Sequence, residues 1–331
     1  MRLRLALAAA IAAFAIQPAA AQGCGDGQRL FTHDAGETCI PADPQRIVSF
    51  DSQWIGAPLH EIGAPVVGSV GYVTEGRNDG RPYMRSLQEI AGLNFGDGGI
   101  TFIGNWRSPD FEVIAGLTPD LIIILDASID ILDQLSAIAP TVVIAESQPW
   151  LDTYRQVADA AGRSDAYEAQ LPLYQAELAR ARAIAAARLG DPANVQLVIA
   201  VPTFDEGLWV SREYGAITQV MRDLGFTMPA AVANMEEEWT QFSPELVGEI
   251  DADFMLTTYT TFFENDGPDD KRAAFDAILP GWSEFLHAPR NNQHLFFNRE
   301  RIRAVMFASL QETLQVFLTN VVTRDFVALE R

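Results

Sequence analysis

The chain has 331 residues, which at roughly 150 residues per domain suggests about two domains. Its 48% hydrophobic and 20% charged residues exclude a disordered or collagen-like chain. The 44 acidic and 23 basic residues leave a net charge of -21, which argues against nucleic-acid binding because that requires a basic face. Lys271 is the only lysine, so nearly every cationic side chain is an arginine.

Residues 1–21 have the pattern of a secretory signal. Arg2 and Arg4 precede an apolar stretch over 5–16, and Ala19–Ala21 supply a small-residue cleavage site. The apolar stretch of about 12 residues is shorter than the roughly 20 that a membrane-spanning helix needs. We therefore expect an exported protein whose mature chain begins near Gln22.

Residues 22–43 form an N-terminal arm that contains both cysteines, Cys24 and Cys39. They lie 15 residues apart in a chain destined for an oxidising compartment, so we expect them to form a disulfide. The alternative is a lipid anchor on Cys24. The residues before it lack the large aliphatic side chain that usually marks such a site.

Short apolar runs alternate with helix-like stretches in both halves of the mature chain. Continuous runs rich in Ile and Val indicate buried parallel strands of an α/β domain. The runs are at 46–50, 65–69, 121–125 and 141–145 in a first lobe (44–162), and at 195–201, 253–257 and 295–297 in a second (191–331).

A strongly helical stretch over 164–189 lies between the lobes, within a linking segment at 163–190. It is rich in Ala, Leu, Glu and Arg and is ended by Gly190 and Pro192. A single helix over this range would be roughly 39 Å long, about the length of a domain. Pro172 should kink this helix or mark its true start, and two separate helices are the alternative.

The two halves share a matched segment, Ser108–Leu121 in the first and Ser243–Phe254 in the second. When Glu112 and Glu245 are aligned, apolar residues, an aspartate and a strand follow at the same positions. Ser followed by Pro is a good helix start, so each lobe has a capped helix with a carboxylate in its first turn. The sequence therefore predicts an α/β protein with two Rossmann-like lobes, one long joining helix and a ligand cleft between the lobes.

Catalytic motifs are absent from the sequence. His33, His60, His287 and His294 have no zinc-type spacing, and there is no GxSxG turn, P-loop or GxGxxG after a predicted strand. We therefore expect neither an enzyme nor a resident cofactor or metal. An exported hydrolase stays as an alternative.

Aromatic residues mixed with arginines follow the predicted strands. Ligands of open parallel sheets bind beyond the carboxyl ends of the strands, and aromatic walls suit a bulky ligand. Arginine offers a planar fork for ligand oxygens. The candidate ligand-binding residues are Trp54, Tyr72, Arg81, Tyr83, Trp106, Arg107, Trp209, Arg212, Tyr214, Trp239, Tyr259, Phe262 and Arg301.

Five segments of the mature chain are, in order, Pro44–Val48, Glu61–Gly68, Pro109–Ile123, Ile138–Val142 and Gly281–Ala288. Together they resemble the periplasmic iron-siderophore binding proteins of ABC importers. This superfamily also includes vitamin B12 and haem binders, and the resemblance implies two lobes with a rigid linking helix. Because the linker is helical, we expect limited closure on binding. We also expect a monomer that passes its ligand to an inner-membrane permease.

The resemblance also implies roles for particular residues. Glu112 and Glu245 match glutamates that dock onto permease arginines. Arg107 and Trp239 occupy places similar to an arginine that holds hydroxamate oxygens and a tryptophan that covers the ligand. The candidate arginines favour an iron chelate of hydroxamate or carboxylate type, with haem or cobalamin as the alternative ligand.

Overall fold

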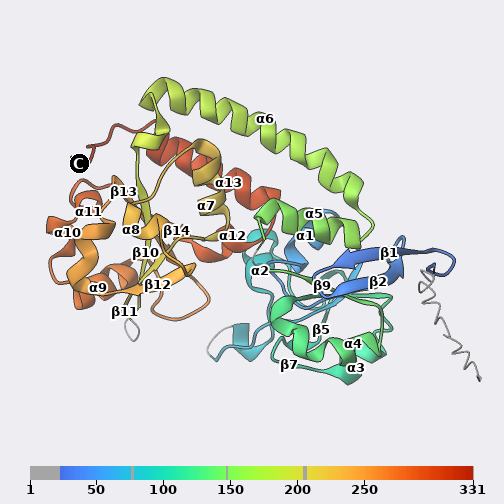
Figure 1. Ribbon diagram of the computed structural model, residues 1–331. Helices are drawn as coiled ribbons and strands as arrows, with labels where there is room; N and C mark the ends of the chain where they lie inside the picture. The colour runs from blue at the N-terminus through green and yellow to red at the C-terminus, as the bar shows by residue number, and fades with distance from the viewer. Residues whose placement is uncertain (1–22, 76–77, 147, 204–206, 331) are drawn as a thin grey trace, which may run out of the picture.

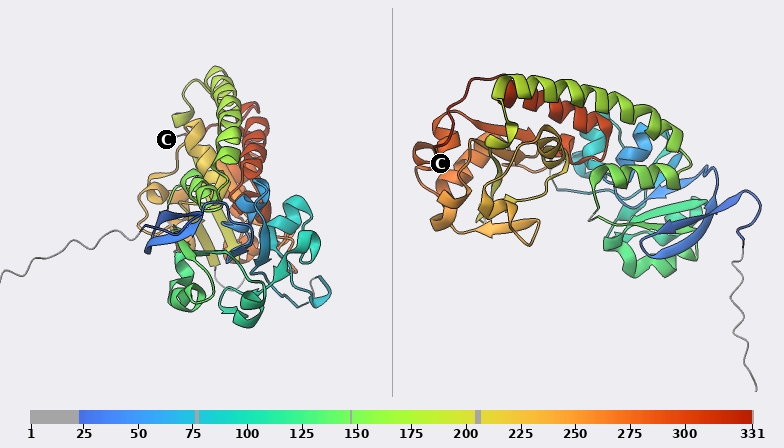
Figure 2. Two further views of the ribbon diagram at one scale, coloured as in Figure 1. Left: turned by 90° about the vertical axis from the view of Figure 1, so that its right-hand side faces the viewer. Right: turned by 45° about the horizontal axis from the view of Figure 1, so that its top comes forward.

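The computed structural model describes residues 23–75, 78–146, 148–203 and 207–330. The predicted export signal at 1–21 lies outside these ranges. The described residues form two α/β lobes side by side, and one long helix passes over both of them, as Figure 1 and Figure 2 show. Within these ranges every helix is too short or too polar to span a bilayer.

The first lobe contains a five-stranded parallel sheet in the order β5-β4-β3-β8-β9. All five residues of β8 are buried, as its unbroken aliphatic sequence predicts for an inner strand of a parallel sheet. Its strands are β3 (Ile47–Ser49), β4 (Val66–Ser69), β5 (Thr101–Phe102), β8 (Leu121–Leu125) and β9 (Thr141–Ile144).

Short helices and one small hairpin connect these strands. The helices are α1 (Gly56–Glu61), α2 (Arg85–Ala91), α3 (Phe111–Gly116), α4 (Leu132–Ser136) and α5 (Trp150–Ala160), with short 3-10 turns η1 (Asn78–Gly80), η2 (Asp97–Gly99) and η3 (Asp126–Ile131). The hairpin pairs β6 (Gly104–Asn105) with β7 (Ser108–Pro109).

The second lobe contains a mixed five-stranded sheet in the order β12-β11-β10-β13-β14. Strands β10 (Leu197–Thr203), β13 (Phe254–Tyr259) and β14 (His294–Asn298) are parallel, as predicted. Strands β11 (Gly207–Ser211) and β12 (Trp239–Phe242) are antiparallel additions. The predicted strands of this lobe did not include β11, which pairs with β10 as an antiparallel hairpin.

The helices of the second lobe surround this sheet. They are α7 (Gly215–Leu224), α8 (Ala230–Ala233), α9 (Pro268–Ile278), α10 (Trp282–Phe285), α11 (His287–Arg290), α12 (Arg299–Arg303) and α13 (Phe307–Phe317), with 3-10 turns η4 (Pro192–Asn194) and η5 (Pro244–Ile250) and a final π-helix η6 (Leu318–Val322).

The linking segment is one uninterrupted helix, α6 (Ser164–Leu189), which confirms the single-helix prediction. Pro172 lies inside the helix and does not mark its start. Its ring faces solvent, while Tyr167, Tyr174 and Leu178 lie on the buried side. The backbone hydrogen bonds on the solvent side of a helix that bends around a core are longer and weaker. A proline, which removes one backbone N–H, is therefore tolerated on that side.

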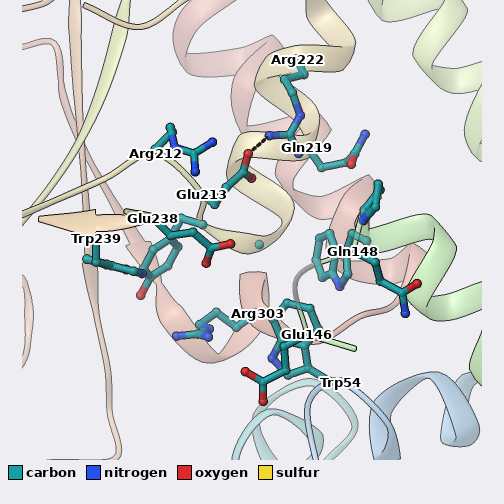
Figure 3. Close-up of a pocket in the computed structure, with 14 residues that line it drawn as sticks. Trp54, Glu146, Gln148, Arg212, Glu213, Gln219, Arg222, Glu238, Trp239 and Arg303 are labelled. Carbon is teal, nitrogen blue, oxygen red and sulfur yellow. Dashed lines mark hydrogen bonds and ion pairs between the residues drawn. The ribbon is translucent and has the colours of Figure 1, made fainter. Parts of the chain in front are cut away.

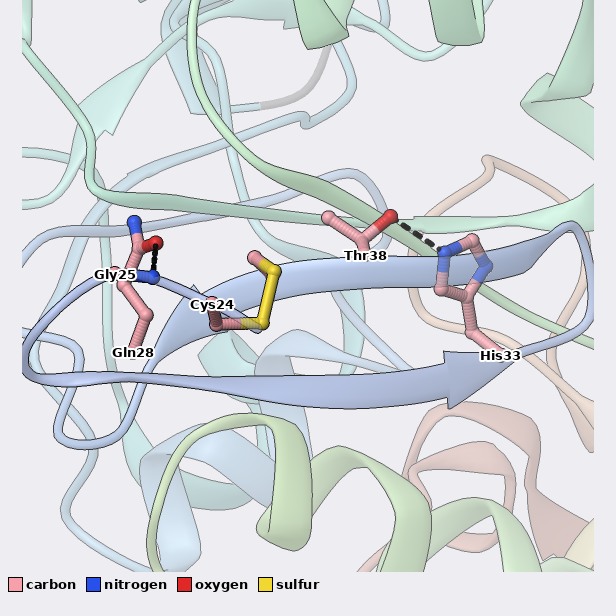
Figure 4. The surroundings of a disulfide bond; sticks show 6 residues. Cys24, Gly25, Gln28, His33 and Thr38 are labelled. Carbon is pink, nitrogen blue, oxygen red and sulfur yellow. Dashed lines mark hydrogen bonds between the residues drawn. A yellow bond between two sulfur atoms is a disulfide. The ribbon is translucent and has the colours of Figure 1, made fainter. Parts of the chain in front are cut away.

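The N-terminal arm is a disulfide-bonded hairpin, β1 (Gln28–His33) paired with β2 (Gly36–Pro41), shown in Figure 4. Cys24 and Cys39 are bonded, with their Cα atoms 5.5 Å apart, as predicted. The hairpin lies along β9, the edge strand of the first sheet. Asp34 N donates to Val143 O (3.2 Å), and Ala145 N donates to the Asp34 carboxylate (2.8 Å). The arm therefore covers a strand edge that would otherwise be open to pairing.

The lobes are joined by a carboxylate that crosses between them. Glu61, at the end of α1 in the first lobe, accepts hydrogen bonds from Phe307 N (2.8 Å) and Ala308 N (2.9 Å), the first residues of α13. It also accepts one from the Tyr154 hydroxyl (2.7 Å). The first N–H groups of a helix have no partner within the helix, and α13 has no side-chain cap of its own. Glu61 thus caps a helix of the opposite lobe.

Aromatic packing reinforces this junction. The ring of Phe307 lies 5.1 Å from that of Tyr154, 5.5 Å from Tyr167 and 6.1 Å from Tyr174. These rings belong to α13, α5 and α6, and one continuous hydrophobic cluster runs from them into both sheets. The lobes therefore share an interior on the side covered by α6.

A second polar contact joins the lobes beneath α6. Arg85 of α2 forms an ion pair with Glu300 of α12, whose side chain is fully buried. The side-chain amide of Gln53 donates to Glu300 (3.2 Å) and to the Ser86 hydroxyl (2.7 Å). The backbone carbonyl of Gln53 accepts from Val305 N (2.9 Å). These contacts hold one edge of the two lobes at a fixed separation.

Replacing Glu61 with Ala removes the acceptor for two backbone N–H groups and one hydroxyl, all of them at the junction. We expect a loss of about 2 kcal/mol in the free energy of unfolding. Urea unfolding followed by circular dichroism measures it. The control is Glu168→Ala, an exposed position on α6, which should change stability by less than about 0.5 kcal/mol. Equal losses of unfolding free energy in the two variants would show that the cross-lobe cap does not contribute to stability.

Candidate ligand-binding site

Three adjoining cavities lie between the lobes. The largest, the central cavity, has a volume of about 560 Å³ and contacts both lobes, as Figure 3 shows. The N-lobe chamber (260 Å³) shares Trp54 and Glu146 with it, and the C-lobe chamber (350 Å³) shares Tyr214 and Trp239 with it. Arg303 lines all three, so the cavities form one cleft around its guanidinium.

The cleft lies where the parallel strands of both sheets end. The first sheet contributes Asp51 after β3, Tyr72 after β4 and Glu146 after β9. The second contributes Thr258 at the end of β13 and Arg299 directly after β14. Parallel strands present their carboxyl ends at one edge of a sheet, which is where α/β folds place ligands.

Two arginines of α12 form the cationic centre of the cleft. Arg299 and Arg303 are four residues apart and therefore lie on one face of the helix. Neither has a carboxylate partner in the described ranges. Burial lowers the pKa of Arg299, and the nearby charges of Arg303 and Arg85 add to this effect. An anionic or oxygen-rich ligand group would relieve the cost of holding these two cations together.

Three other cations of the cleft are paired with carboxylates, whereas Arg212 in the central cavity has no ion pair in the described part of the chain. Arg85 is paired with Glu300, and Arg222 lies 2.5 Å from Glu213. A dashed line marks the Arg222–Glu213 pair in Figure 3. Lys271 lies 2.5 Å from its partner Asp266. These pairs fix the walls of the cleft without giving it a large positive charge.

Carboxylates also line the cleft. Asp51 accepts hydrogen bonds from Gln53 N (2.6 Å) and Trp54 N (2.5 Å). Burial raises the pKa of Asp51, although these two hydrogen bonds and the charge of Arg303 oppose that rise. Glu146 and Glu238 line the central cavity as well. Negative groups are therefore part of the site.

Aromatic side chains supply the walls and several unused donors. Tyr214 and Trp239 meet edge to face with their ring centroids 5.0 Å apart. Trp209 Nε1, Arg212 Nε and Arg299 Nε are buried, with no hydrogen-bond partner in the described part of the chain. Buried donors are nearly always paired, so these atoms are the natural partners of ligand or solvent oxygens.

The structure brings seven of the thirteen candidate residues to the cleft. Trp54, Trp106 and Tyr72 line it from the first lobe, and Trp209, Arg212, Tyr214 and Trp239 line it from the second.

The other six candidates lie outside the three cavities. Tyr83 and Phe262 are buried with their rings 4.8 Å apart, and Tyr83 stacks behind Tyr72. Three arginines are bound elsewhere: Arg81 to Asp79, Arg301 to Glu312, and Arg107 over the face of Trp106. Tyr259 ends β13 without reaching a cavity.

Arg299 and Arg303 were missing from the sequence-based candidates, as were Arg85, Asp51 and Lys271. The sequence does contain a signal for the first two. Asn298 caps α12 by accepting from Glu300 N (2.9 Å), so the helix begins at Arg299. Residues four apart then share a face, whereas Arg301, two positions on, points to the other side and pairs with Glu312.

Glu112 and Glu245 are exposed in the first turns of α3 and η5. The predicted Ser cap of the first helix is wrong. Asp110 caps α3 instead, accepting from Glu112 N (3.1 Å) and Val113 N (3.0 Å), while Ser108 belongs to β7. Ser243 does precede η5, but its hydroxyl contacts the Glu245 carboxylate (3.3 Å) rather than the backbone.

No three histidine, cysteine or carboxylate side chains converge on a metal site in the described ranges. His33 and His287 are buried outside the cleft, and His294 bonds to the Thr257 hydroxyl (2.7 Å) in the second sheet. The cleft therefore offers a ligand arginines, aromatic rings and carboxylates that are not grouped into a metal site in the described ranges.

Comparison with known proteins identifies relatives of the same architecture. The chain is 27% identical over 228 residues to the ferric enterobactin-binding periplasmic protein FepB of Escherichia coli O6:H1, covering 67% of this chain and 69% of that protein. It is 25% identical over 234 residues to the Fe(3+)-citrate-binding protein YfmC of Bacillus subtilis, covering 69% and 67%.

Solved structures share the two-lobed fold. The FhuD protein from S. pseudintermedius matches 90% of this chain and 99% of its own, with a TM-score of 0.68 at 22% identity. Staphylococcus aureus SirA complexed with staphyloferrin B matches 87% and 97%, with a TM-score of 0.69 at 20% identity. A family model described as periplasmic binding protein matches residues 90–288, more than half of the sequence. The chain therefore belongs to the periplasmic binding protein family.

Proposed function

We propose that this protein is exported to the periplasm, captures a ferric siderophore of hydroxamate or carboxylate type in its cleft, and delivers it to an inner-membrane ABC permease. The observation that carries the proposal is the pair Arg299 and Arg303, two guanidinium groups without carboxylate partners in the described ranges, at the meeting point of three aromatic-walled cavities. Ligand oxygens that carry negative charge can accept hydrogen bonds from both.

Relatives support an iron chelate as the ligand. The names of FepB and YfmC specify ferric enterobactin and ferric citrate, and a third relative, YfiY of Bacillus subtilis, is named a probable siderophore-binding lipoprotein. Membership of a binding-protein family also excludes the exported hydrolase considered from the sequence.

The charge balance of the cleft favours a chelate of low net charge. Among the described residues, six cationic and five anionic side chains line the three cavities, and the buried Glu300 carboxylate bonds to Arg85. Hydroxamates neutralise ferric iron, whereas catecholates leave the complex strongly anionic. Asp51, Glu146 and Glu238 would repel a strongly anionic complex.

Haem is the alternative ligand, and the tyrosines of the cleft are less suited to it than the arginines are to a siderophore. An axial tyrosine binds iron best without its proton. Burial raises the pKa of Tyr72, and the Tyr214 hydroxyl is hydrogen-bonded to Thr258 (2.9 Å). Burial therefore disfavours the ionised form of Tyr72, and the Tyr214 hydroxyl is already engaged by Thr258, which leaves the arginine-rich centre as the better-suited site.

A titration of tryptophan fluorescence tests the proposal directly. Five tryptophans line the cleft and should be quenched by a bound ferric complex: Trp54, Trp106, Trp150, Trp209 and Trp239. We expect saturable quenching with ferrichrome or ferric citrate and none with cobalamin. Quenching by haemin alone would replace the siderophore with haem, and no binding by any of these ligands would overturn the function.

Two arginines of α12, Arg303 inside the cleft and Arg301 outside it, provide a test variant and its control. Replacing Arg303 with Gln removes the guanidinium shared by all three cavities and should weaken ferric siderophore binding roughly 10- to 100-fold, the value of one or two charged hydrogen bonds. The control Arg301→Gln breaks the pair with Glu312 outside the cleft and should leave the Kd within about twofold. The same titration measures both, and reversed effects would move the site to the opposite face of α12.

Docking onto the permease is proposed for Glu112 and Glu245. Both carboxylates are exposed, one on each lobe, and are free to meet arginines of a partner. Glu112→Ala and Glu245→Ala should reduce uptake of radioactive iron by cells severalfold while the Kd of the purified protein stays unchanged. Glu249→Ala, an exposed position in the same turn as Glu245, serves as the control. A matching loss of affinity would place the glutamates in ligand binding instead.

A further inference from the structure

We propose that the C-lobe chamber holds an uncharged organic arm of the ligand, remote from the iron, and that the indole N–H of Trp209 donates a hydrogen bond to a carbonyl of that arm. This inference rests on the proposed siderophore function and concerns selectivity within it. The chamber is the 350 Å³ cavity whose own walls are Val201, Thr203, Trp209, Thr258, Asp266 and Lys271.

The chamber is reached from the cationic centre. Arg303 lines it together with both other cavities, Arg299 is shared with the N-lobe chamber, and Tyr214 and Trp239 are shared with the central cavity. A ligand whose metal-binding oxygens lie at the two arginines can therefore extend an arm into the chamber without leaving the cleft. Its volume is within the range of cavities that bind small organic groups.

The apolar wall of the chamber comes from the hairpin in the second sheet. Val201 on β10 lies directly opposite Trp209 on β11 in the antiparallel register, so the two side chains are cross-strand neighbours. Trp239 lies on β12, the next strand of the sheet. These side chains provide a flat, largely apolar surface for methylene or peptide groups.

The back of the chamber has no net charge. Lys271 is nearly fully buried, lies 2.5 Å from Asp266 and donates to Pro202 O (3.4 Å). The Asp266 carboxylate also accepts from Thr260 N (3.1 Å), so the pair is fixed in place. Beyond Arg299 and Arg303, which the chamber shares with the other cavities, a charged arm would meet no unpaired charge and would have to be desolvated against this pair. The wall therefore selects an uncharged arm.

The side chain of Trp209 also carries an unused hydrogen-bond donor. Trp209 Nε1 is buried and has no hydrogen-bond partner in the described part of the chain. An indole N–H is a donor only, so its partner has to be an acceptor such as an amide or ester carbonyl. Leaving a buried donor unpaired costs free energy, which a ligand carbonyl would recover on binding.

Two ferric ligands of different reach test this inference. Ferrichrome is uncharged and rich in amide carbonyls, whereas ferric citrate is too small to occupy both the arginine centre and the chamber. Trp209→Phe keeps an aromatic wall but removes the N–H, and it should weaken ferrichrome binding about tenfold while changing the ferric citrate Kd less than twofold. Binding is followed by isothermal titration calorimetry, which does not depend on tryptophan fluorescence.

Trp282→Phe is the matched control. Trp282 is also buried in the second lobe with an unpaired Nε1, but it stacks on Phe275 (4.4 Å) in the core and lines none of the three cavities. It should leave both affinities unchanged. Val201→Phe fills the chamber beside Trp209 and should weaken ferrichrome binding more than Trp209→Phe does, so the test stands even if one variant fails to fold.

The outcomes separate this inference from the function on which it rests. Equal losses for both ligands, or no loss for either with Trp209→Phe and Val201→Phe, would overturn the chamber as a selective site. Wild-type protein that binds ferric citrate but not ferrichrome would also overturn it, while the siderophore function stands. Wild-type protein that binds neither ligand would remove both proposals.

Discussion

Glu61 belongs to the first lobe, yet its carboxylate satisfies the free N–H groups at the start of α13 in the second. A helix terminus needs such a partner, and here the partner comes from the opposite lobe. Because Phe307 at the same terminus packs among tyrosines of α5 and α6, polar and apolar contacts coincide at one junction. Movement of one lobe against the other would break both kinds of contact at once.

This junction explains why the cleft can be built before a ligand arrives. Arg85, Gln53 and Glu300 cross between the lobes at the edge of the cavities, so the side chains around Arg303 come from elements already held together. Little ordering free energy is then lost when a ligand binds, which is the benefit of a preorganised site. The small net charge of the walls follows from the same design, since three of the six cations that line the cavities are ion-paired with neighbouring carboxylates.

The parts of the fold that follow from local pattern were predictable from the sequence. The aliphatic run at Leu121–Leu125 is a buried strand, and the Ala-rich stretch from Ser164 is one helix. The hairpin strand Gly207–Ser211 was not predictable, because its mixed Trp and Ser side chains resemble a loop until β10 provides a partner. Arg299 and Arg303 were missed because their role depends on where α12 begins, a property set by one cap residue, Asn298.

Lys271 is the only lysine of the sequence and lies buried behind Asp266. The outer surface therefore presents guanidinium groups but no side-chain ammonium. Amine-directed reagents such as activated esters therefore have no exposed lysine to modify in the folded protein.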